Sequence, residues 1–316
     1  MKIVIPGGTG HVGSALALAL HRKGHDVVVL SRSPCRLPWR SALWDGETPS
    51  DWTSEIDGAD AVINLAGQSV NCRYNAANRR IIKDSRVKST RIVGEAIARA
   101  RRPPPLWLQA STATIYAHRC DADNDETTGL LGGEEPNAPA TWNFSTDVAA
   151  SWERAIDQAR VPATRKVKLR TAIVMSPEDG GAFDSLLRLV RFGLGGRAGN
   201  GRQYVSWIHG EDFTRAVLWL IEHSTIEGAV NLAAPNPQPN WAFMRALRQA
   251  WGRGFGLPAT GWMLEVGAFF LRTETELILK SRRVVPGRLL QEGFDFQFPD
   301  WPVAARELCH RWRETH

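Results

Sequence analysis

Cysteine is scarce in this chain, and its distribution excludes two kinds of site. Only four of the 316 residues are cysteine, and they lie far apart, at positions 35, 72, 120 and 309. No two of them form a Cys-x-x-Cys pair, so we expect neither a disulfide framework nor a structural zinc site, and we predict no metal centre. Because such cysteine usage is typical of a reducing compartment, we expect a cytoplasmic protein.

Long apolar runs are also lacking, which argues against a helix that spans a membrane. No stretch approaches the ~20 apolar residues that a membrane span needs. The most suggestive one, residues 262–271, is short and contains Glu265. The first residues read as a strand that runs directly into a glycine turn, which leaves no room for a signal peptide. The sequence therefore predicts a soluble protein without a membrane partner.

Lysine is rare, whereas arginine is abundant. The chain has 39 basic and 33 acidic residues, a formal net charge of +6, and only seven of the basic residues are lysine. Basic residues are scattered, apart from one dense, helix-like segment over residues 79–102. We interpret this segment as a solvated helix face that could help an anionic ligand approach. We therefore expect no nucleic-acid partner.

Strand and helix patterns alternate along most of the chain. Five apolar runs are typical of buried parallel strands, and they cover residues 2–6, 26–30, 61–66, 106–111 and 167–175. Helical spacing of apolar residues predicts helices over residues 11–23, 76–101 and 145–159, the last with Ser145 as its N-cap. This alternation predicts an α/β fold, namely a Rossmann-type, doubly wound parallel sheet.

The C-terminal part has a different pattern. A proline-rich connector precedes two predicted helices, a strand that carries Phe294, Phe296 and Phe298 on one face, and a last helix; these cover residues 235–240, 241–251, 260–281, 294–298 and 302–312. We therefore divide the chain into a nucleotide-binding domain over residues 1–234, with substrate-side insertions near 176–209, and a smaller C-terminal α/β lobe over residues 235–316.

A glycine-rich turn joins the first strand to the first helix. Gly7, Gly10 and Gly13 form a Gly-x-x-Gly-x-x-Gly pattern. Glycine lets the backbone turn tightly and approach a pyrophosphate, while the helix N-terminus offers free N–H groups to it. The pattern therefore predicts a dinucleotide site formed by Gly7, Thr9, Gly10, His11, Val12 and Gly13.

The second and third strands end in residues that favour one dinucleotide. NAD-specific folds usually place Asp or Glu after the second strand, whereas this chain has Ser31 and Arg32 there. A carboxylate would repel the 2′-phosphate of NADP, and Ser and Arg would bind it, so we predict NADP(H) as the cofactor. Further contacts are expected from small residues at the next strand ends, namely Leu65, Ala66, Gly67 and Ser111.

Several motifs together resemble the extended short-chain dehydrogenase/reductases. They are the glycine turn, Asn64-Leu65-Ala66-Gly67, Asp84-Ser85-Arg86 and residues 110–116 (Ala-Ser-Thr-Ala-Thr-Ile-Tyr). Later stretches, such as Gly201-Arg202-Gln203 with Ser206-Trp207-Ile208-His209, resemble the branch usually labelled "epimerase family protein", which carries a C-terminal domain of unknown function. The resemblance spans essentially the whole chain. It implies an NAD(P)-binding Rossmann fold with a small substrate lobe.

The catalytic pattern that the resemblance implies is missing. Members with redox or epimerase chemistry use a Tyr-x-x-x-Lys pair, in which the lysine lowers the tyrosine pKa and the phenolate moves a proton. The three tyrosines of this chain, Tyr74, Tyr116 and Tyr204, are followed four residues later by Asn, Cys and Ile. When Glu153 is aligned with the glutamate that usually closes the family's catalytic helix, Ser145 and Ala149 take the positions of the tyrosine and the lysine.

Three residues remain as candidates for catalysis. Thr112 falls where the resemblance implies a Ser or Thr that binds the substrate oxygen, although it could equally cap the local backbone. Tyr116 ends the same motif and could instead pack to support the turn. His209 could act as an acid or base near pH 7, or begin a helix together with Asp212. Polar residues of loops expected to rim the substrate cleft, together with one tryptophan, are Asn71, Arg73, Arg202, Gln203 and Trp207.

These features leave three hypotheses for the function. The first is an NADP-dependent oxidoreductase on a small carbonyl or alcohol, with a non-standard proton donor. The second is a non-catalytic NADP(H) sensor or scaffold, as the missing tyrosine and lysine suggest. A sugar-nucleotide epimerase is the third. The resemblance also suggests a homodimer formed through the helices over residues 76–101 and 145–159.

Overall fold

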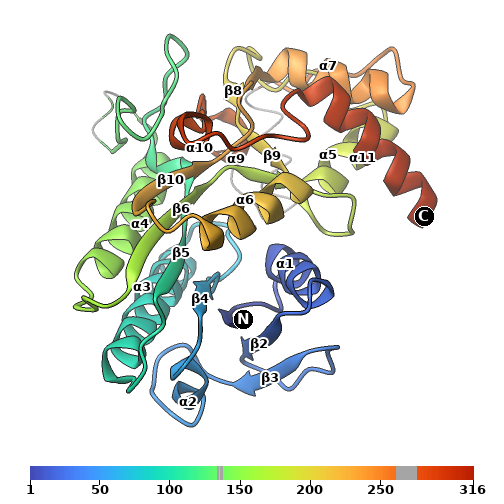
Figure 1. Cartoon of the computed structure of the whole chain (residues 1–316). Coiled ribbons are helices and arrows are strands. Elements are labelled where there is room, and N and C mark those ends of the chain that lie inside the picture. Colours follow the sequence, from blue (N-terminus) through green and yellow to red (C-terminus); the bar gives the residue numbers. More distant parts are fainter. Residues whose placement is uncertain (134, 136–137, 261–275) are drawn as a thin grey trace.

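A computed structural model describes the whole chain except residues 134, 136–137 and 261–275 (Figure 1). At its centre lies a seven-stranded sheet with parallel pairings throughout and the order β3-β2-β1-β4-β5-β6-β10. The strands are β1 (Lys2–Pro6), β2 (Asp26–Ser31), β3 (Arg40–Leu43), β4 (Ala61–Asn64), β5 (Leu106–Thr112), β6 (Arg165–Thr171) and β10 (Gly228–Leu232). The order reverses between β1 and β4, which confirms the predicted doubly wound, Rossmann-type sheet.

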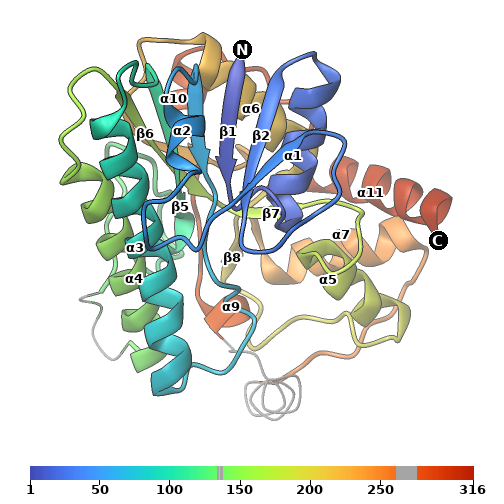
Figure 2. The same ribbon diagram turned by 90° about the horizontal axis from the view of Figure 1, so that it is seen from below.

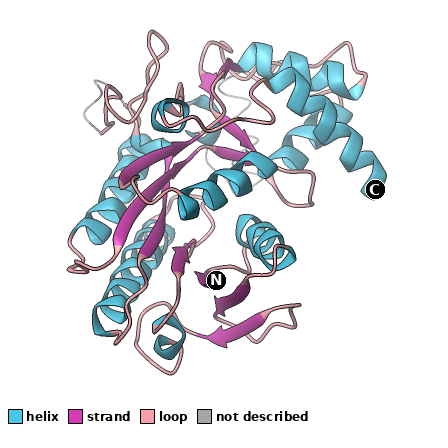
Figure 3. Ribbon diagram, viewed as in Figure 1, coloured by secondary structure: helices cyan, strands magenta, loops and turns pink. Residues whose placement is uncertain are grey.

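Helices cover both faces of this sheet (Figures 1 and 3). One face packs against α1 (His11–Arg22) and α6 (Gly210–Glu222), and the other against α2 (Thr53–Ile56), α3 (Ala76–Arg99) and α4 (Ala140–Asp157). The alternation of strand side chains explains the two layers. Ile3 and Ile5 lie in the α1 and α6 core, whereas Val4 lies in the opposite core. Fully burying such a side chain contributes about 1.5–3 kcal/mol.

A second hydrophobic core lies beside the sheet. It joins α5 (Ala182–Arg191), α7 (Asn240–Trp251) and α11 (Trp301–Thr315), and its centre is a stacked pair, Phe243 and Trp301, with ring centroids 3.9 Å apart. Two short sheets accompany it: β7 (Ile173–Met175) with β9 (Trp207–His209), and β8 (Tyr204–Val205) with β11 (Gln238–Pro239). This core takes residues from both sides of position 234, where the domain boundary stays a prediction.

Short elements complete the described part of the C-terminal region. They are α9 (Glu276–Leu279) and α10 (Gly287–Gln291), and a 3₁₀ helix, η1 (Ala113–Ile115), follows β5 on the sheet. In Figure 2 the strands of the sheet point downward, and α9 lies near that lower edge between the α3–α4 pair and the α5–α7 pair. Among the described residues, no helix is both long enough and apolar enough to cross a membrane.

Three element predictions were wrong for identifiable reasons. Residues 167–175 form two strands, because the chain leaves the main sheet at Ala172 and pairs with β9. Helix α4 begins at Ala140, so Ser145 lies inside the helix and is not its N-cap. Residues 294–298 form no strand, because Phe294 and Phe296 pack on the sheet core while Phe298 packs in the second core.

Several elements were not predicted, among them β3, α2, α5, β8, β9, β10, β11 and α10, and one prediction is largely untested. Strand β3 is short and mostly exposed at the sheet edge, and α2 is a single turn, so neither has a strong apolar period. Most of the helix predicted over residues 260–281 lies outside the described residues. Its described end is α9, which stops at Leu279.

Candidate functional site

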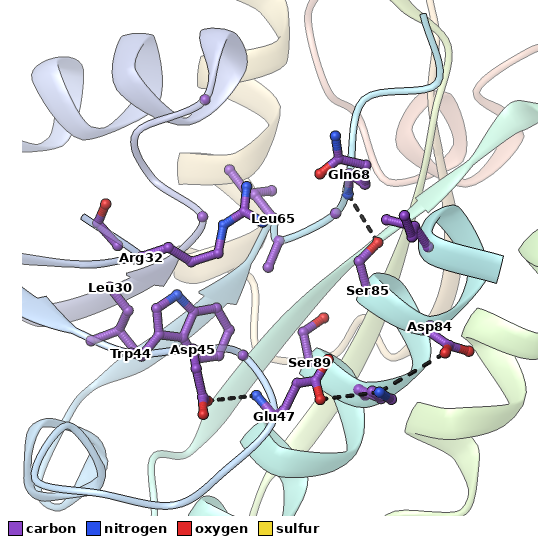
Figure 4. A pocket seen from close by; sticks show the side chains of 18 of the residues that line it. Leu30, Arg32, Trp44, Asp45, Glu47, Leu65, Gln68, Asp84, Ser85 and Ser89 are labelled. Atoms are coloured by element: carbon purple, nitrogen blue, oxygen red, sulfur yellow. Dashed lines mark hydrogen bonds and ion pairs between the residues drawn. The ribbon is translucent and has the colours of Figure 1, made fainter. Parts of the chain in front are cut away.

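A cleft of about 480 Å³ opens at the carboxyl ends of β1, β2 and β4, where doubly wound sheets bind their ligands (Figure 4). Predicted residues that line it are Gly7, Thr9, Gly10, Ser31, Arg32, Leu65, Ala66 and Gly67. The structure therefore brings together eight of the twelve residues predicted for the cofactor, from three different strand ends.

The glycine turn has the geometry of a dinucleotide cradle. Gly7 has φ +77°, and a Cβ there would lie 2.7 Å from the Cα of Ala66, so only glycine fits. A Cβ on Gly13 would lie 2.8 Å from the carbonyl oxygen of Gly7. Gly10 begins α1 without a side-chain cap, which leaves the first N–H groups of the helix available to an anion.

Arg32 supplies an uncompensated positive charge on one wall of the cleft (Figure 4). It is exposed, and it forms no ion pair within the described part of the chain. Other charges of the cleft neutralise one another, since Lys88 binds Glu47 at 3.0 Å and lies 3.9 Å from Asp84. Hydrogen bonds from the hydroxyl and N–H of Thr48 lower the pKa of Asp45 to about 2. Arg32 therefore fits the phosphate predicted beside it.

Several residues of the cleft were missed by the sequence analysis. They are Leu30, Trp44, Asp45, Gly46, Glu47, Gln68, Arg80, Ile81, Asp84, Ser85, Lys88 and Ser89. Residues 44–47 of this set follow β3, a strand that was not predicted because its apolar pattern is weak. Leu30 lies on β2 and Gln68 follows β4, and the others lie on α3, where Asp84 and Ser85 belong to a motif that carries the family resemblance. Their position on the cleft wall, with Ser85 accepting a hydrogen bond from the N–H of Gln68 at 3.0 Å, follows from packing (Figure 4).

The other four predicted cofactor residues do not line this cleft, and one of them, Gly13, is buried beneath the glycine turn. His11 and Val12 line a separate groove along α1 and α6, and the Nε2 of His11 is hydrogen-bonded to Ser176 at 2.7 Å. Ser111 is buried, and its hydroxyl donates to Glu153 on α4 at 2.7 Å. Ser111 therefore ties β5 to α4. The backbone of His11 still belongs to the first turn of α1.

Thr112 lies at the carboxyl end of β5 and is partly exposed. Its hydroxyl accepts a hydrogen bond from the N–H of Thr114 at 3.2 Å and so caps η1. The same hydroxyl donates to the Oγ1 of Thr114, also at 3.2 Å. Thr112 therefore serves as the local cap that the sequence allowed, and its place at the strand end also suits contact with a substrate.

Tyr116 is buried within a network of polar side chains. Only 2% of it is exposed, and its hydroxyl donates to Asn231 and accepts from Arg170, both at 2.9 Å. Arg170 in turn forms two 2.8 Å hydrogen bonds with Glu153. Burial raises the pKa of Tyr116. Tyr116 therefore packs to support the turn, which was one of the two roles considered from the sequence. Its hydroxyl has no access to the cleft.

His209 is buried at the start of α6, in contact with the second core. Its Nδ1 accepts a hydrogen bond from the N–H of Glu211 at 3.2 Å, and its Nε2 is paired with Glu307 at 2.8 Å. The ring also stacks on Phe298, with centroids 3.9 Å apart. His209 is thus the N-cap of α6, which agrees with the expectation that it begins a helix. It also borders the groove that contains His11.

The five predicted substrate residues do not form one surface. Trp207 is fully buried in the second core, because β9 turns its ring toward Trp301. Gln203 is buried and donates to the carbonyl oxygen of Ala198 at 2.9 Å, so it holds its own loop. Asn71 and Arg202 are exposed and Arg73 is half-buried, in two different loops. Their role in substrate binding stays a prediction.

Polar residues from the C-terminal region reach the end of β5, and none of them was predicted as a site residue. Glu276 accepts a hydrogen bond from the hydroxyl of Ser145 at 2.5 Å, and Lys280 donates to the carbonyl oxygen of Thr114 at 3.1 Å. Arg282 donates to the Oγ1 of Thr114 at 3.2 Å. No sequence signal marked them, because they lie more than 130 residues from the groups that they contact.

Comparison with known proteins agrees with this arrangement. The family model described as "NAD dependent epimerase/dehydratase family" matches residues 3–233, and one described as "Domain of unknown function (DUF1731)" matches residues 259–308. The bovine epimerase family protein SDR39U1 is 33% identical, over 98% of this chain and 99% of its own length. The Bacillus subtilis epimerase family protein YfhF is 28% identical, over 98% of both chains.

Solved structures give the same assignment. The crystal structure of human epimerase family protein SDR39U1 with NADPH has a TM-score of 0.85 and 29% identity, and the match covers 98% of this chain and 99% of that one. The predicted resemblance to the extended short-chain dehydrogenase/reductases of the epimerase branch is thereby confirmed. By its sequence, its sheet and its glycine cradle, the chain belongs to the NAD dependent epimerase/dehydratase family.

Proposed function

We propose that the protein binds NADP(H) and acts as an oxidoreductase on a small carbonyl or alcohol substrate. The observation that carries the cofactor is the pairing of the cradle at Gly7 and Gly13 with the uncompensated charge of Arg32. The human relative, whose structure contains NADPH, supports the same cofactor. When bound, the nicotinamide supplies or accepts a hydride, so this chain's residues must bind the substrate and move the accompanying proton.

A titration tests the cofactor proposal. Energy transfer from the thirteen tryptophans to the reduced nicotinamide reports binding of NADPH and NADH. Because Arg32 binds the 2′-phosphate in this proposal, Arg32→Ala should lose at least ~10-fold in NADPH affinity while NADH affinity changes little. Arg36→Ala is the matched control, since Arg36 is exposed in the same loop but does not line the cleft. Equal binding of both nucleotides by the wild type would contradict the preference.

Turnover is tested separately, with NADPH and a panel of short aldehydes, 2-oxo acids and quinones. Oxidation of NADPH by at least one of them is expected. A non-catalytic NADP(H) sensor is the second candidate, and it is favoured by one observation, namely Ser145 and Ala149 on α4 in place of the family's tyrosine and lysine. NADPH binding without turnover of any panel member would favour the sensor. Epimerase activity on sugar nucleotides is our third and least supported proposal.

Two further expectations belong to this proposal. A cytoplasmic location fits the four cysteines, all in the described part of the chain, among which no disulfide bond forms. A homodimer through α3 and α4 would use the outer faces of two helices that already pack side by side (Figures 1 and 2). Size-exclusion chromatography with light scattering measures the mass directly, and a mass near 35.0 kDa would contradict the dimer.

A further inference from the structure

A cluster of polar side chains at the end of β5, which we term the β5-end cluster, is built from three separate parts of the chain. It consists of Thr114, Ser145, Glu276, Lys280 and Arg282, joined by the three hydrogen bonds given above. The charged members are buried: Glu276 and Lys280 are 1% exposed and Arg282 is 7% exposed. An NH2 group of Arg282 also lies 3.8 Å from the carboxylate of Glu276. The C-terminal region therefore brings three ionisable groups to this strand end.

The cluster continues to the nucleotide cleft. The hydroxyl of Tyr74 is hydrogen-bonded to Ser145, and burial followed by the charge of Glu276 raises the pKa of Tyr74 to about 12. Tyr74 also interacts electrostatically with Arg86, whose guanidinium lies behind the cleft wall, because a Cβ on Gly67 would be 3.2 Å from its Cζ. Tyr74 thus contacts the β5-end cluster through Ser145 and interacts electrostatically with Arg86 on the cofactor side of the molecule.

The hydroxyl groups and the charged groups at this strand end differ in exposure. Ser145, Thr112 and Thr114 are each partly exposed, whereas the ionisable groups are buried. A serine hydroxyl by itself is a weak acid and base, and it moves a proton efficiently only when a second group accepts or returns that proton. At 2.5 Å from the hydroxyl of Ser145, Glu276 is in place to be this second group.

Building on the function proposed above, we propose that Ser145 is the hydroxyl that contacts the reacting substrate oxygen and that Glu276 accepts its proton. For an alcohol substrate, the O–H proton passes to the Oγ of Ser145 while the proton of Ser145 passes to Glu276. Bound oxidised NADP would accept the C–H hydrogen as a hydride, which would leave a carbonyl compound. The proton finally leaves the buried Glu276 for solvent by way of the partly exposed hydroxyl of Ser145. A carbonyl substrate would follow the same steps in reverse.

Two cations accompany Glu276 in the cluster. The guanidinium of Arg282 lies 3.8 Å from its carboxylate, and Lys280 also interacts with it electrostatically. Among the described residues, titratable groups that interact with the cluster include Tyr74, on the loop before α3, and Glu135 and His118, which both lie near Lys280. Arg282 and Lys280 also attach the C-terminal segment to Thr114, so they are positioning residues for Glu276.

A cysteine probe tests the position of Ser145 without a known substrate. In Ser145→Cys, the rate of alkylation by iodoacetamide is followed on the peptide by mass spectrometry, with and without saturating NADPH. Ser151→Cys is the matched control, because Ser151 is also half-buried on α4 and hydrogen-bonded to a carboxylate, Asp147, at 3.4 Å. We expect NADPH to slow alkylation at position 145 at least tenfold and to leave position 151 unchanged.

The same probe tests Glu276. A carboxylate close to the thiol raises the thiol pKa by about 1–3, so adding Glu276→Gln to Ser145→Cys should lower that pKa, measured from the pH dependence of alkylation. The pKa at position 151 should not change. Glu276→Asp keeps the charge and should restore the high pKa. Because the readout is a thiol pKa, a merely structural role of Glu276 would not produce this pattern.

The outcomes separate the two proposals. If NADPH binds but does not slow alkylation at position 145, or if Glu276→Gln leaves the thiol pKa unchanged in a variant that still binds NADPH, the role of Ser145 and Glu276 is overturned while the cofactor proposal stands. If the wild type binds no NADPH, the proposed function fails first. With any carbonyl compound that the panel identifies, Ser145→Ala should lower kcat at least ~100-fold without changing NADPH affinity.

Discussion

The two ends of the candidate site differ in how the chain builds them. At the nucleotide end, most of the predicted contacts come from the few residues that follow a single strand, as with Gly7 to Gly13 after β1 and Ser31 with Arg32 after β2. At the β5 end, Ser145 meets a residue 131 positions away, and Thr114 meets one 168 positions away.

This contrast shows which kinds of site a sequence reveals. A turn that needs positive φ and close backbone contact leaves a mark in adjacent residues, because only glycine satisfies it. A contact between Ser145 on α4 and Glu276 near the C-terminus produces no recognisable pattern in the residues adjacent to either one. The glycine turn and the charge after β2 could therefore be predicted from adjacent residues, while the β5 end emerged only from the fold. The predictions below test this contrast, beginning with the largest effect.

Arg170→Met should destabilise the scaffold beneath the β5 end most strongly. It removes both hydrogen bonds to Glu153 and leaves that carboxylate buried without its main partner, which costs about 3–5 kcal/mol. Chemical denaturation measures the change in the free energy of unfolding. Arg99→Met is the control, since its pair with Glu95 is exposed and contributes less than ~0.5 kcal/mol. Similar losses for the two variants would show that the buried network is not a scaffold.

Gly7→Ala should abolish detectable NADPH binding at the nucleotide end. The added Cβ would lie 2.7 Å from the backbone of Ala66 and would force the turn to open. We expect at least a ~100-fold loss of affinity, or about 2.7 kcal/mol. Gly24→Ala is the control, since Gly24 has φ +82° but no atom within 4 Å of its Cβ position. It should cost about 1 kcal/mol in stability and leave NADPH affinity unchanged.

Lys280→Met should change how stability depends on pH. Burial is the largest cause that lowers the pKa of Lys280, from 10.5 to about 8, so between these values the unfolded chain binds more protons than the folded one. Wild-type stability therefore gains a contribution as pH rises from about 8 to about 10.5, and this contribution is absent in the variant. Unfolding curves of both proteins across this range give the difference. A constant difference would mean that Lys280 keeps its ordinary pKa in the folded protein.

Lys88→Met should have the smallest effect. Lys88 lines the cleft, but it is partly exposed and already bound to Glu47 at 3.0 Å. Its removal frees one carboxylate and should weaken NADPH binding by no more than ~3-fold, with stability changed by less than ~1 kcal/mol. Titration with NADPH at low and high salt measures this loss. A loss equal to that of Arg32→Ala would assign the phosphate contact to both cations.

The fold was predictable to a large extent, and the exceptions have physical causes. Continuous apolar runs marked β1, β2, β4 and β5, because strands buried on both faces contain little else. Neither edge strand of the sheet was predicted: β3 is mostly exposed, and β10 is a short run of five residues that begins with glycine. Residues 294–298 have the alternation of a strand, but their aromatic rings are divided between two cores. The alternation of apolar residues alone therefore did not identify the cores against which these rings pack.

The sequence by itself determined the glycine turn, the charge after the second strand, the absence of a Tyr-x-x-x-Lys pair and the family. These properties depend on adjacent residues, through allowed backbone angles and the charge at a strand end. Only the tertiary structure decided that Tyr116 and His209 are buried with their polar atoms occupied, and that Glu276 reaches Ser145. Burial and long-range contacts arise when distant segments pack together, and no local pattern encodes which segments these will be.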